Sequence, residues 1–277
     1  MTDNNLANIL FSPTSFKNDD KILLSLSQWQ SIQSLLHDLS NLLDSLLSKN
    51  SILSQVLSEI PSITNPYQTL QDLNDSTHSF INNILAEVYQ LAGDLYDYGK
   101  KAEVHFGSII QLLGLDTPDW EKICKLLNAL QQTNTNYKAN VQKTYDGLVE
   151  YVDILQKHKS DLESTQQLVS ETRQAFLFLN KETGVLNEFS GQMTSLLGII
   201  TKLLDEVQNT LPLIVKLEDA WGTIGIELDK TVADINTANN TNTDMVMTVA
   251  NLNVAANEWH DIANDAHNFM MNLHLSF

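Results

Sequence analysis

Residues 118–176 read PDWEKICKLLNALQQTNTNYKANVQKTYDGLVEYVDILQKHKSDLESTQQLVSETRQAF. Counted in sevens from Leu127, seven of the eight positions are apolar, and Asn134 is the exception. Such a repeat is typical of a long helix that packs along other long helices. Thr117, followed by Pro118 and acidic residues, is a signal for the start of that helix. We therefore expect a helix of more than 50 residues that begins here.

The same period occurs on both sides of this stretch. It predicts a helix within residues 67–117, and after Pro212 it predicts a helix of about 65 residues, roughly 97 Å long at 1.5 Å per residue. The Leu-dense residues 21–49 predict a further helix with several apolar faces, and an extension of this helix through residues 52–60 is left open. These helices are longer than a compact globule of this size is wide, about 40 Å. We therefore expect an elongated molecule.

The composition agrees with a helical fold. Leucine occupies 43 of the 277 positions, whereas glycine occupies 10 and proline 5. Because helix formers dominate and turn formers are rare, α/β and all-β folds are disfavoured. The predicted fold class is all-α, an elongated antiparallel bundle of four to five long helices with a small amphipathic head inserted between the two longest.

The charge of the chain excludes several classes of partner. The 16 Lys and Arg residues face 34 Asp and Glu residues, which gives a net charge of −18, and Arg173 is the only arginine. Nucleic acid and polybasic recognition of anionic lipid are therefore not expected. The single cysteine, Cys124, excludes an internal disulfide. We expect no secretory signal peptide, because Asp3 precedes the first apolar residues, and no transmembrane helix.

Residues 184–215 differ from both of their flanks. The 27 residues from 189 to 215 contain only three charged side chains, those of Lys202, Asp205 and Glu206, and we expect the strict seven-residue register to stop there. The segment is strongly amphipathic. We expect it to form a head domain, with a tail domain made of residues 1–183 and 216–277. The candidate membrane-contacting residues of the head are Val185, Leu186, Phe189, Met193, Leu196, Leu197, Ile199, Ile200, Leu203, Leu204 and Val207.

Two interpretations of this segment are open. It can fold back and complete the core of the bundle, as apolar stripes usually do. It can also be sequestered at first and later released onto lipid, since wide apolar arcs of this kind lie in membrane interfaces. Three glycines recur every seven residues and allow either a hinge or a close helix contact. The predicted hinge residues are Gly184, Gly191, Gly198 and Pro212.

The sequence contains no motif for catalysis or for phosphate, metal or dinucleotide binding. We therefore expect no enzyme activity, no cofactor, no metal ion and no small-molecule substrate. His260, His267 and His274 are spaced by sevens, about 10.5 Å apart along a helix, which is too far for one zinc ion. Such a row can respond to acidification, or it can be three solvated side chains.

In its overall plan the chain resembles the α-helical pore-forming toxins related to haemolysin E (cytolysin A), a group that includes the haemolysin BL and non-haemolytic enterotoxin components and the tripartite haemolysins. Two very long helices flank a charge-poor amphipathic segment, and further long helices precede them. The stretch from Lys216 to Trp221 is similar to the family's recurring Trp on the helix after the head, and Trp259 lies in a comparable setting.

The resemblance implies a secreted toxin component without a conventional signal peptide. It also implies a head that contacts a lipid membrane after a conformational change, self-oligomerisation, and assembly with homologous toxin components into a helical pore. The sequence departs from the family at Lys202, Asp205 and Glu206, since heads that span the bilayer are almost uncharged. This favours one component of a multi-protein pore. The alternatives are a non-enzymatic coiled-coil scaffold or adaptor and a lipid-exchanging helical bundle.

Overall fold

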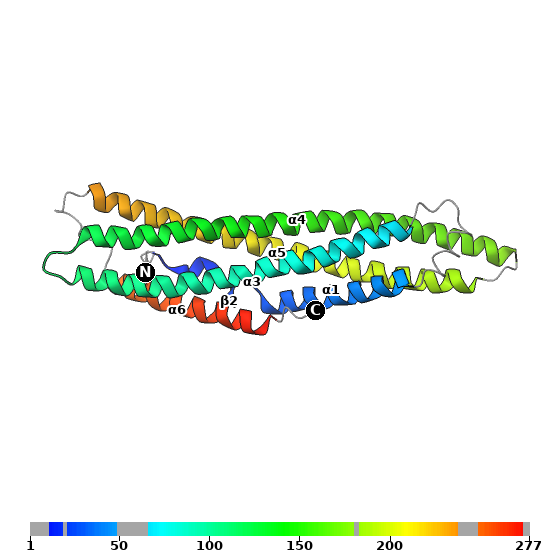
Figure 1. The fold of residues 1–277 in the computed structure, drawn as a ribbon, viewed down its shortest axis with the longest axis horizontal. Helices are drawn as coiled ribbons and strands as arrows, with labels where there is room; N and C mark the ends of the chain where they lie inside the picture. The colour runs from blue at the N-terminus through cyan, green and yellow to red at the C-terminus, as the bar shows by residue number, and fades with distance from the viewer. Residues whose placement is uncertain (1–10, 19–20, 49–65, 180–182, 238–248, 274–277) are drawn as a thin grey trace, which may run out of the picture. The chain divides into compact units, whose positions relative to one another are not determined.

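The computed structural model describes residues 11–18, 21–48, 66–179, 183–237 and 249–273 (Figure 1). Apart from a short 3-10 helix and two two-residue strands near the N-terminus, the described chain is α-helical, which confirms the predicted all-α class. The elements are η1 (Pro13–Phe16), β1 (Lys17–Asn18), β2 (Lys21–Ile22), α1 (Leu26–Ser48), α3 (Pro66–Leu113), α4 (Trp120–Phe178), α5 (Gly184–Thr237) and α6 (Val249–Asn272). The helices expected within 21–49, within 67–117 and after Pro118 are confirmed, whereas residues 52–60 lie outside the described residues.

Helix α4 begins slightly later than the sequence signal suggests. Its first residue is Trp120, and the Asp119 carboxylate accepts a hydrogen bond of 3.1 Å from the backbone N–H of Lys122. Asp119 therefore caps the helix, and the expected cap, Thr117, lies outside it. The predicted seam of α4 is buried from Leu127 to Val169. This is the burial that a seven-residue repeat requires.

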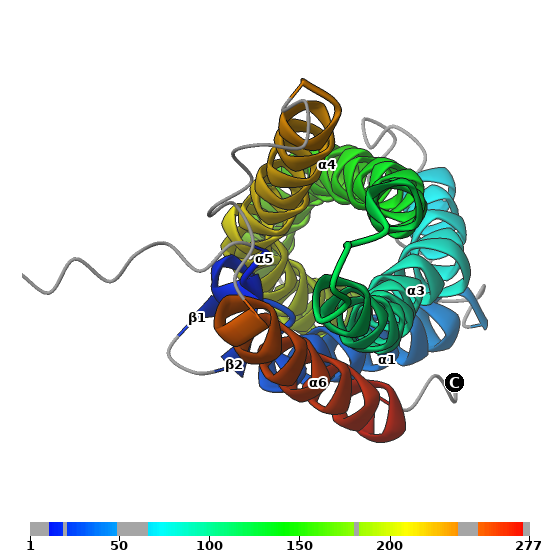
Figure 2. The same cartoon turned by 90° about the vertical axis from the view of Figure 1, so that its left-hand side faces the viewer.

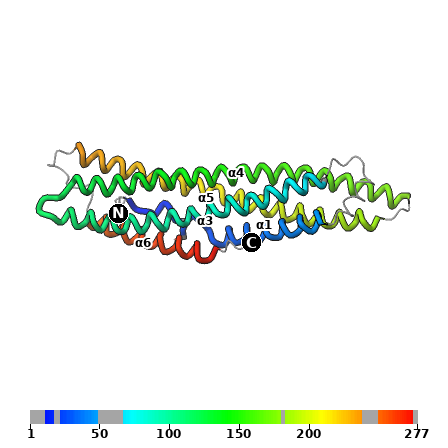
Figure 3. The backbone as a smooth tube through the Cα atoms, in the orientation of Figure 1, coloured from blue at the N-terminus to red at the C-terminus, as the bar shows by residue number. Residues whose placement is uncertain are grey.

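One prediction about the last third of the chain is wrong. Pro212 does not start a helix, because it lies inside α5, whose continuous path can be followed in Figure 3. A proline cannot donate to the carbonyl four residues earlier, here that of Gln208. Both residues are exposed, so water can reach the freed carbonyl. The expected single helix of about 65 residues is instead the second part of α5 followed by α6.

The contacts divide the chain into two packing units, and α3, α4 and α5 each contribute to both. Unit 1 consists of residues 1–26, 87–145 and 212–274, and unit 2 of residues 27–86, 146–211 and 275–277. By packing alone, residues 184–211 thus belong with α1, the start of α3 and the end of α4. A separate functional role of residues 184–215 is a different question and stays a prediction.

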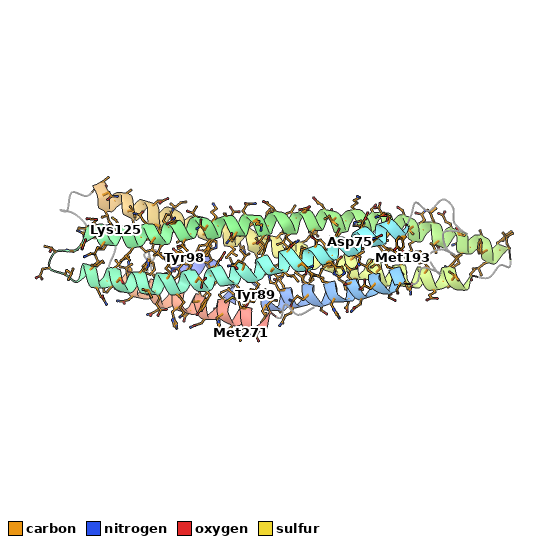
Figure 4. The ribbon with its side chains drawn as sticks, viewed as in Figure 1. Asp75, Tyr89, Tyr98, Lys125, Met193 and Met271 are labelled. Carbon is orange, nitrogen blue, oxygen red and sulfur yellow. The ribbon has the colours of Figure 1, made fainter. Side chains whose placement is uncertain are left out.

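An aromatic cluster forms the core of unit 1. Tyr98, labelled in Figure 4, lies with its ring centroid 4.9 Å from that of Trp221 and 4.7 Å from that of Trp259. Phe16 of η1 packs edge-on against Trp221 at 4.6 Å. The cluster therefore joins α3, α5, α6 and the N-terminal segment, and Figure 2 shows that segment beside α5 and α6.

The N-terminal segment is held in unit 1 through Phe11, which has a positive φ of 65°. Its N–H donates to the carboxylate of Glu227 at 2.7 Å, and its carbonyl accepts from the Trp259 indole at 2.9 Å. Burial raises the pKa of Glu227, and the hydrogen bond from Phe11 opposes that rise. These long-range hydrogen bonds stabilise the left-handed backbone conformation of Phe11, which is otherwise disfavoured for phenylalanine.

Helix α6 approaches α3 closely at Gly99. A Cβ atom added there would lie 2.6 Å from the carbonyl oxygen of Trp259 and 2.9 Å from the Cβ atom of Ala263. Glycine is therefore required at this crossing for the two helices to pack at the observed distance.

In its described residues, unit 2 contains four helical segments. Its centre contains Phe80 of α3 and Tyr151 of α4, whose rings stack with centroids 4.0 Å apart. The Tyr151 hydroxyl donates to the hydroxyl of Thr77 at 3.4 Å, so this buried polar group has a partner. The start of α5, which carries the predicted head residues, packs in this unit.

Candidate functional site

The predicted head residues all lie on α5 within unit 2, and most of them are buried. Val185, Leu197 and Ile199 are half-buried. The side chain of Met193, labelled in Figure 4, belongs to the buried set. The buried positions are Leu186, Phe189, Met193, Leu196, Ile200, Leu203, Leu204 and Val207. In this conformation the apolar face of the segment is part of the core, which both interpretations above require before any release.

The buried positions also correct the expectation that the seven-residue register stops here. Leu186, Met193, Ile200 and Val207 are spaced by sevens, and the parallel row from Phe189 does the same. The pattern continues into the second part of α5. It is hidden in the sequence because further apolar residues beside the two rows blur the contrast between faces.

Polar contacts fix the exposed side of the segment to its neighbours. Thr194 accepts a hydrogen bond of 2.6 Å from the Gln166 side-chain amide of α4. Glu206 accepts one of 3.0 Å from the Ser31 hydroxyl of α1. Arg173 of α4 reaches the side-chain oxygen of Asn187 at 3.4 Å. Release of the segment would require breaking these contacts as well as exposing the apolar rows.

The predicted hinge residues lie on the same helix. A Cβ atom added to Gly184, Gly191 or Gly198 would meet no other atom within 4 Å. The close-contact interpretation of these glycines is therefore wrong for this conformation. Their role as hinges, with Pro212, stays a prediction.

Sequence reasoning missed a second feature of unit 2, at the end of α4. Leu177, Phe178 and Leu179 are 59%, 89% and 61% exposed. We call these three residues the tip patch. In Figure 1 the end of α4 and the start of α5 extend beyond the described ends of α1 and α3, so neither of those helices covers the patch. The available signal was the unbroken apolar run of residues 175–179, which continues past the last heptad position at Phe176.

The histidine row lies in unit 1 at the contact between α3 and α6. His260 Nδ1 is 3.2 Å from the carboxylate of Glu103 and 3.3 Å from the ammonium group of Lys100. The hydrogen bond from His260 lowers the pKa of Glu103. The ring of His267 lies 5.5 Å from that of Tyr96, and His274 is outside the described residues. A response of this row to acidification stays a prediction.

Within the described part of the chain, no helix is both long enough and apolar enough to cross a bilayer. In the same residues, no group of three or more His, Cys, Asp or Glu side chains is arranged to hold a metal ion.

The fold is shared with solved toxin structures. The SmhA component of the tripartite α-pore-forming toxin Smh from Serratia marcescens superposes with a TM-score of 0.64 at 16% identity, over 98% of this chain and 97% of that one. The chain has the fold of an α-pore-forming toxin component. The HblL1 toxin component of Bacillus cereus superposes with a TM-score of 0.60 at 10% identity, over 95% of this chain and 99% of that one. No protein-family model and no curated protein sequence matches the chain. The predicted resemblance is therefore confirmed at the level of fold.

Proposed function

We propose that this chain is one component of a secreted, multi-protein pore-forming toxin. In this proposal it binds a target membrane through the α5 segment 184–215, changes conformation, and assembles with copies of itself and with homologous components into a helical pore that lyses the cell. The observation that supports it most is the fold, which matches SmhA over nearly the full length of both chains. The proposed activity requires no catalytic residue.

The burial of the α5 segment supports a conformational change. The eight buried side chains among its predicted head residues contribute roughly 12–24 kcal/mol, at about 1.5–3 kcal/mol each, and this must be replaced when they leave the core. Lipid or an apolar surface of a partner component can replace it. The opposite face of the helix carries Lys202 and Asp205, which are exposed. Such a face suits pore water, and this favours a partner-dependent component over a toxin that acts alone.

Dye release from liposomes tests the proposal. We expect the purified chain to bind vesicles, and we expect leakage when the chains co-expressed with it are added. Sizing in detergent should then show a species much larger than the monomer. If no combination gives binding, leakage or a larger species, the coiled-coil scaffold becomes the better interpretation.

A cross-link tests whether α5 must leave α4. Gln166→Cys with Thr194→Cys, in a Cys124→Ser background, places two thiols at positions whose side chains are hydrogen-bonded here, and the oxidised protein is the fraction in which thiol titration shows a disulfide. We expect the oxidised protein to lose dye release and to regain it on reduction. If the oxidised protein releases dye normally, the segment does not act by leaving α4.

The matched control is a cross-link between the same two helices in unit 1. Gln131, which is half-buried, donates to the exposed Asp229 at 2.9 Å. Cysteines at these two positions should leave dye release unchanged when oxidised, because no separation of α4 and α5 is proposed there. Loss of activity in both locked variants would indicate a general effect of cross-linking.

A further inference from the structure

The tip patch is the one place in the described chain where large apolar side chains are exposed at consecutive positions. Among the described residues, the other exposed large apolar residues are single side chains: Val104, Leu115, Val215, Ile226, Val249, Val254 and Met271. Scattered residues of that kind are normal on protein surfaces, whereas a contiguous exposed cluster marks a contact site.

We propose that Leu177, Phe178 and Leu179 form a lipid-binding site that engages the membrane interface in the conformation described here, before the α5 segment is released. This inference rests on the proposed function and adds to it a site outside the predicted head. The predicted head residues are buried or half-buried in this conformation and cannot make the first contact. The tip patch is exposed without any rearrangement.

The arrangement of the three side chains favours lipid over a folded protein partner. Successive residues of a helix point about 100° apart, so Leu177, Phe178 and the following Leu179 cover roughly 200° of the circumference at the end of α4. A stripe on one side of a helix fits a groove on another protein. A helix end that is apolar on several sides suits penetration into a medium without a preferred direction, such as the acyl-chain boundary.

Charge complementarity points to the same partner. Between Glu171 and Glu182 the sequence has no acidic residue but contains Arg173 and Lys181, in a chain where acids outnumber bases by about two to one. Arg173 is four residues before Leu177, so the two share a helix face about 6 Å apart along the axis.

The outer part of the Arg173 guanidinium lies at the surface. Its Nη1 atom makes an exposed 3.4 Å contact with the side-chain oxygen of Asn187, whereas its Nε atom is buried and faces away from solvent. When the patch enters the interface, this cation lies at the level of the lipid phosphates, where arginine side chains extend from apolar surroundings.

Vesicle flotation with matched variants tests the site. The probe is vesicles of phosphatidylcholine and phosphatidylglycerol. Leu177→Ser with Phe178→Ser should reduce vesicle affinity by at least about tenfold, because two apolar groups leave the interface. Its circular dichroism should be unchanged, since both side chains are exposed. The control, Val104→Ser with Ile226→Ser, removes two equally exposed apolar side chains and should bind as the wild type does.

A label at the patch reports insertion directly. Phe178→Cys in the Cys124→Ser background, carrying an environment-sensitive fluorophore, should shift to shorter wavelength with vesicles and be quenched by lipid-borne quenchers. The same label at Ile226→Cys should not respond. An unshifted label at position 178 on vesicle-bound protein overturns the inference, as does full vesicle affinity of the patch variant. If the patch variant keeps its vesicle affinity but no longer binds a partner component, the inference is also overturned, and the patch is a protein contact.

The outcomes separate this site from the proposed function. If the patch variant binds vesicles and supports dye release like the wild type, the lipid site is wrong and the toxin function stands. If the wild type binds through the patch but causes no leakage in any combination of components, the toxin function is wrong and the lipid site stands.

Discussion

Replacing one phenylalanine by alanine should have opposite consequences at two positions near the tip of unit 2. Phe189 on α5 is fully buried, whereas Phe178 on α4 is 89% exposed. Phe189→Ala removes a buried ring and leaves a cavity, which costs about 3–5 kcal/mol of unfolding free energy. Phe178→Ala removes a solvated ring and should change that free energy by less than about 0.5 kcal/mol.

Thermal unfolding followed by circular dichroism measures the difference. A loss of 3–5 kcal/mol corresponds to a fall in Tm of roughly 6–20 °C for a chain of this size. We expect that fall for Phe189→Ala and an unchanged Tm for Phe178→Ala. Vesicle affinity should show the reverse order, with Phe178→Ala the more affected under conditions where both variants are folded.

The comparison can refute the packing argument. If Phe189→Ala is as stable as the wild type, the start of α5 does not contribute its apolar face to the core of unit 2. If Phe178→Ala is strongly destabilised, the tip patch is covered by another part of the chain. Either result would remove the basis for a sequestered segment beside an exposed patch.

Three further predictions concern unit 1. Gly99→Ala should lower the free energy of unfolding by about 1–3 kcal/mol, because the added Cβ atom meets the Trp259 carbonyl oxygen. At a helical position with open space, the same substitution would raise it by about 1 kcal/mol. A rise in Tm would therefore contradict the close packing of α3 against α6 at Gly99. Trp259→Phe should cost at least about 1–3 kcal/mol in urea unfolding, since the Phe11 carbonyl loses its indole donor, and a neutral effect would show that water replaces it. Glu227→Gln should stabilise the chain near neutral pH, because burial raises the pKa of Glu227 and its charged form is the disfavoured one in the fold. The difference in unfolding free energy between Glu227→Gln and the wild type should shrink as the pH of urea unfolding is lowered from about 7 to about 4, because Glu227 then becomes protonated in both the folded and the unfolded chain. A difference that does not depend on pH would refute this interpretation.

The helices were predictable because their signal is local. In α4 the row from Leu127 to Val169 carries the repeat in its own residues, and it is buried as expected. The failure at Pro212 is also local in origin. Proline usually starts or ends a helix, and here an exposed position lets water satisfy the freed carbonyl. The sequence does not show whether a position is exposed in that way until the neighbouring helices are known.

The candidate site was only partly predictable for a related reason. The amphipathic character of residues 184–215 follows from their order along the helix, but their burial depends on α1, α3 and α4 being present beside them. The tip patch shows that an apolar segment without such neighbours stays exposed. Phe178 is as apolar as Phe189, and it is exposed because α1 and α3 do not extend to the end of α4 (Figure 1).

The sequence by itself determined that this chain forms long helices, where three of them lie, and which side of each is apolar, because helix formation and amphipathicity depend on residues a few positions apart. The tertiary structure decided which apolar sides are covered and which contacts hold the N-terminal segment. Phe11 is fixed by Glu227 and Trp259, which are 216 and 248 positions away. Burial and long-range hydrogen bonds are properties of neighbours in space, and those neighbours are set only when the helices pack.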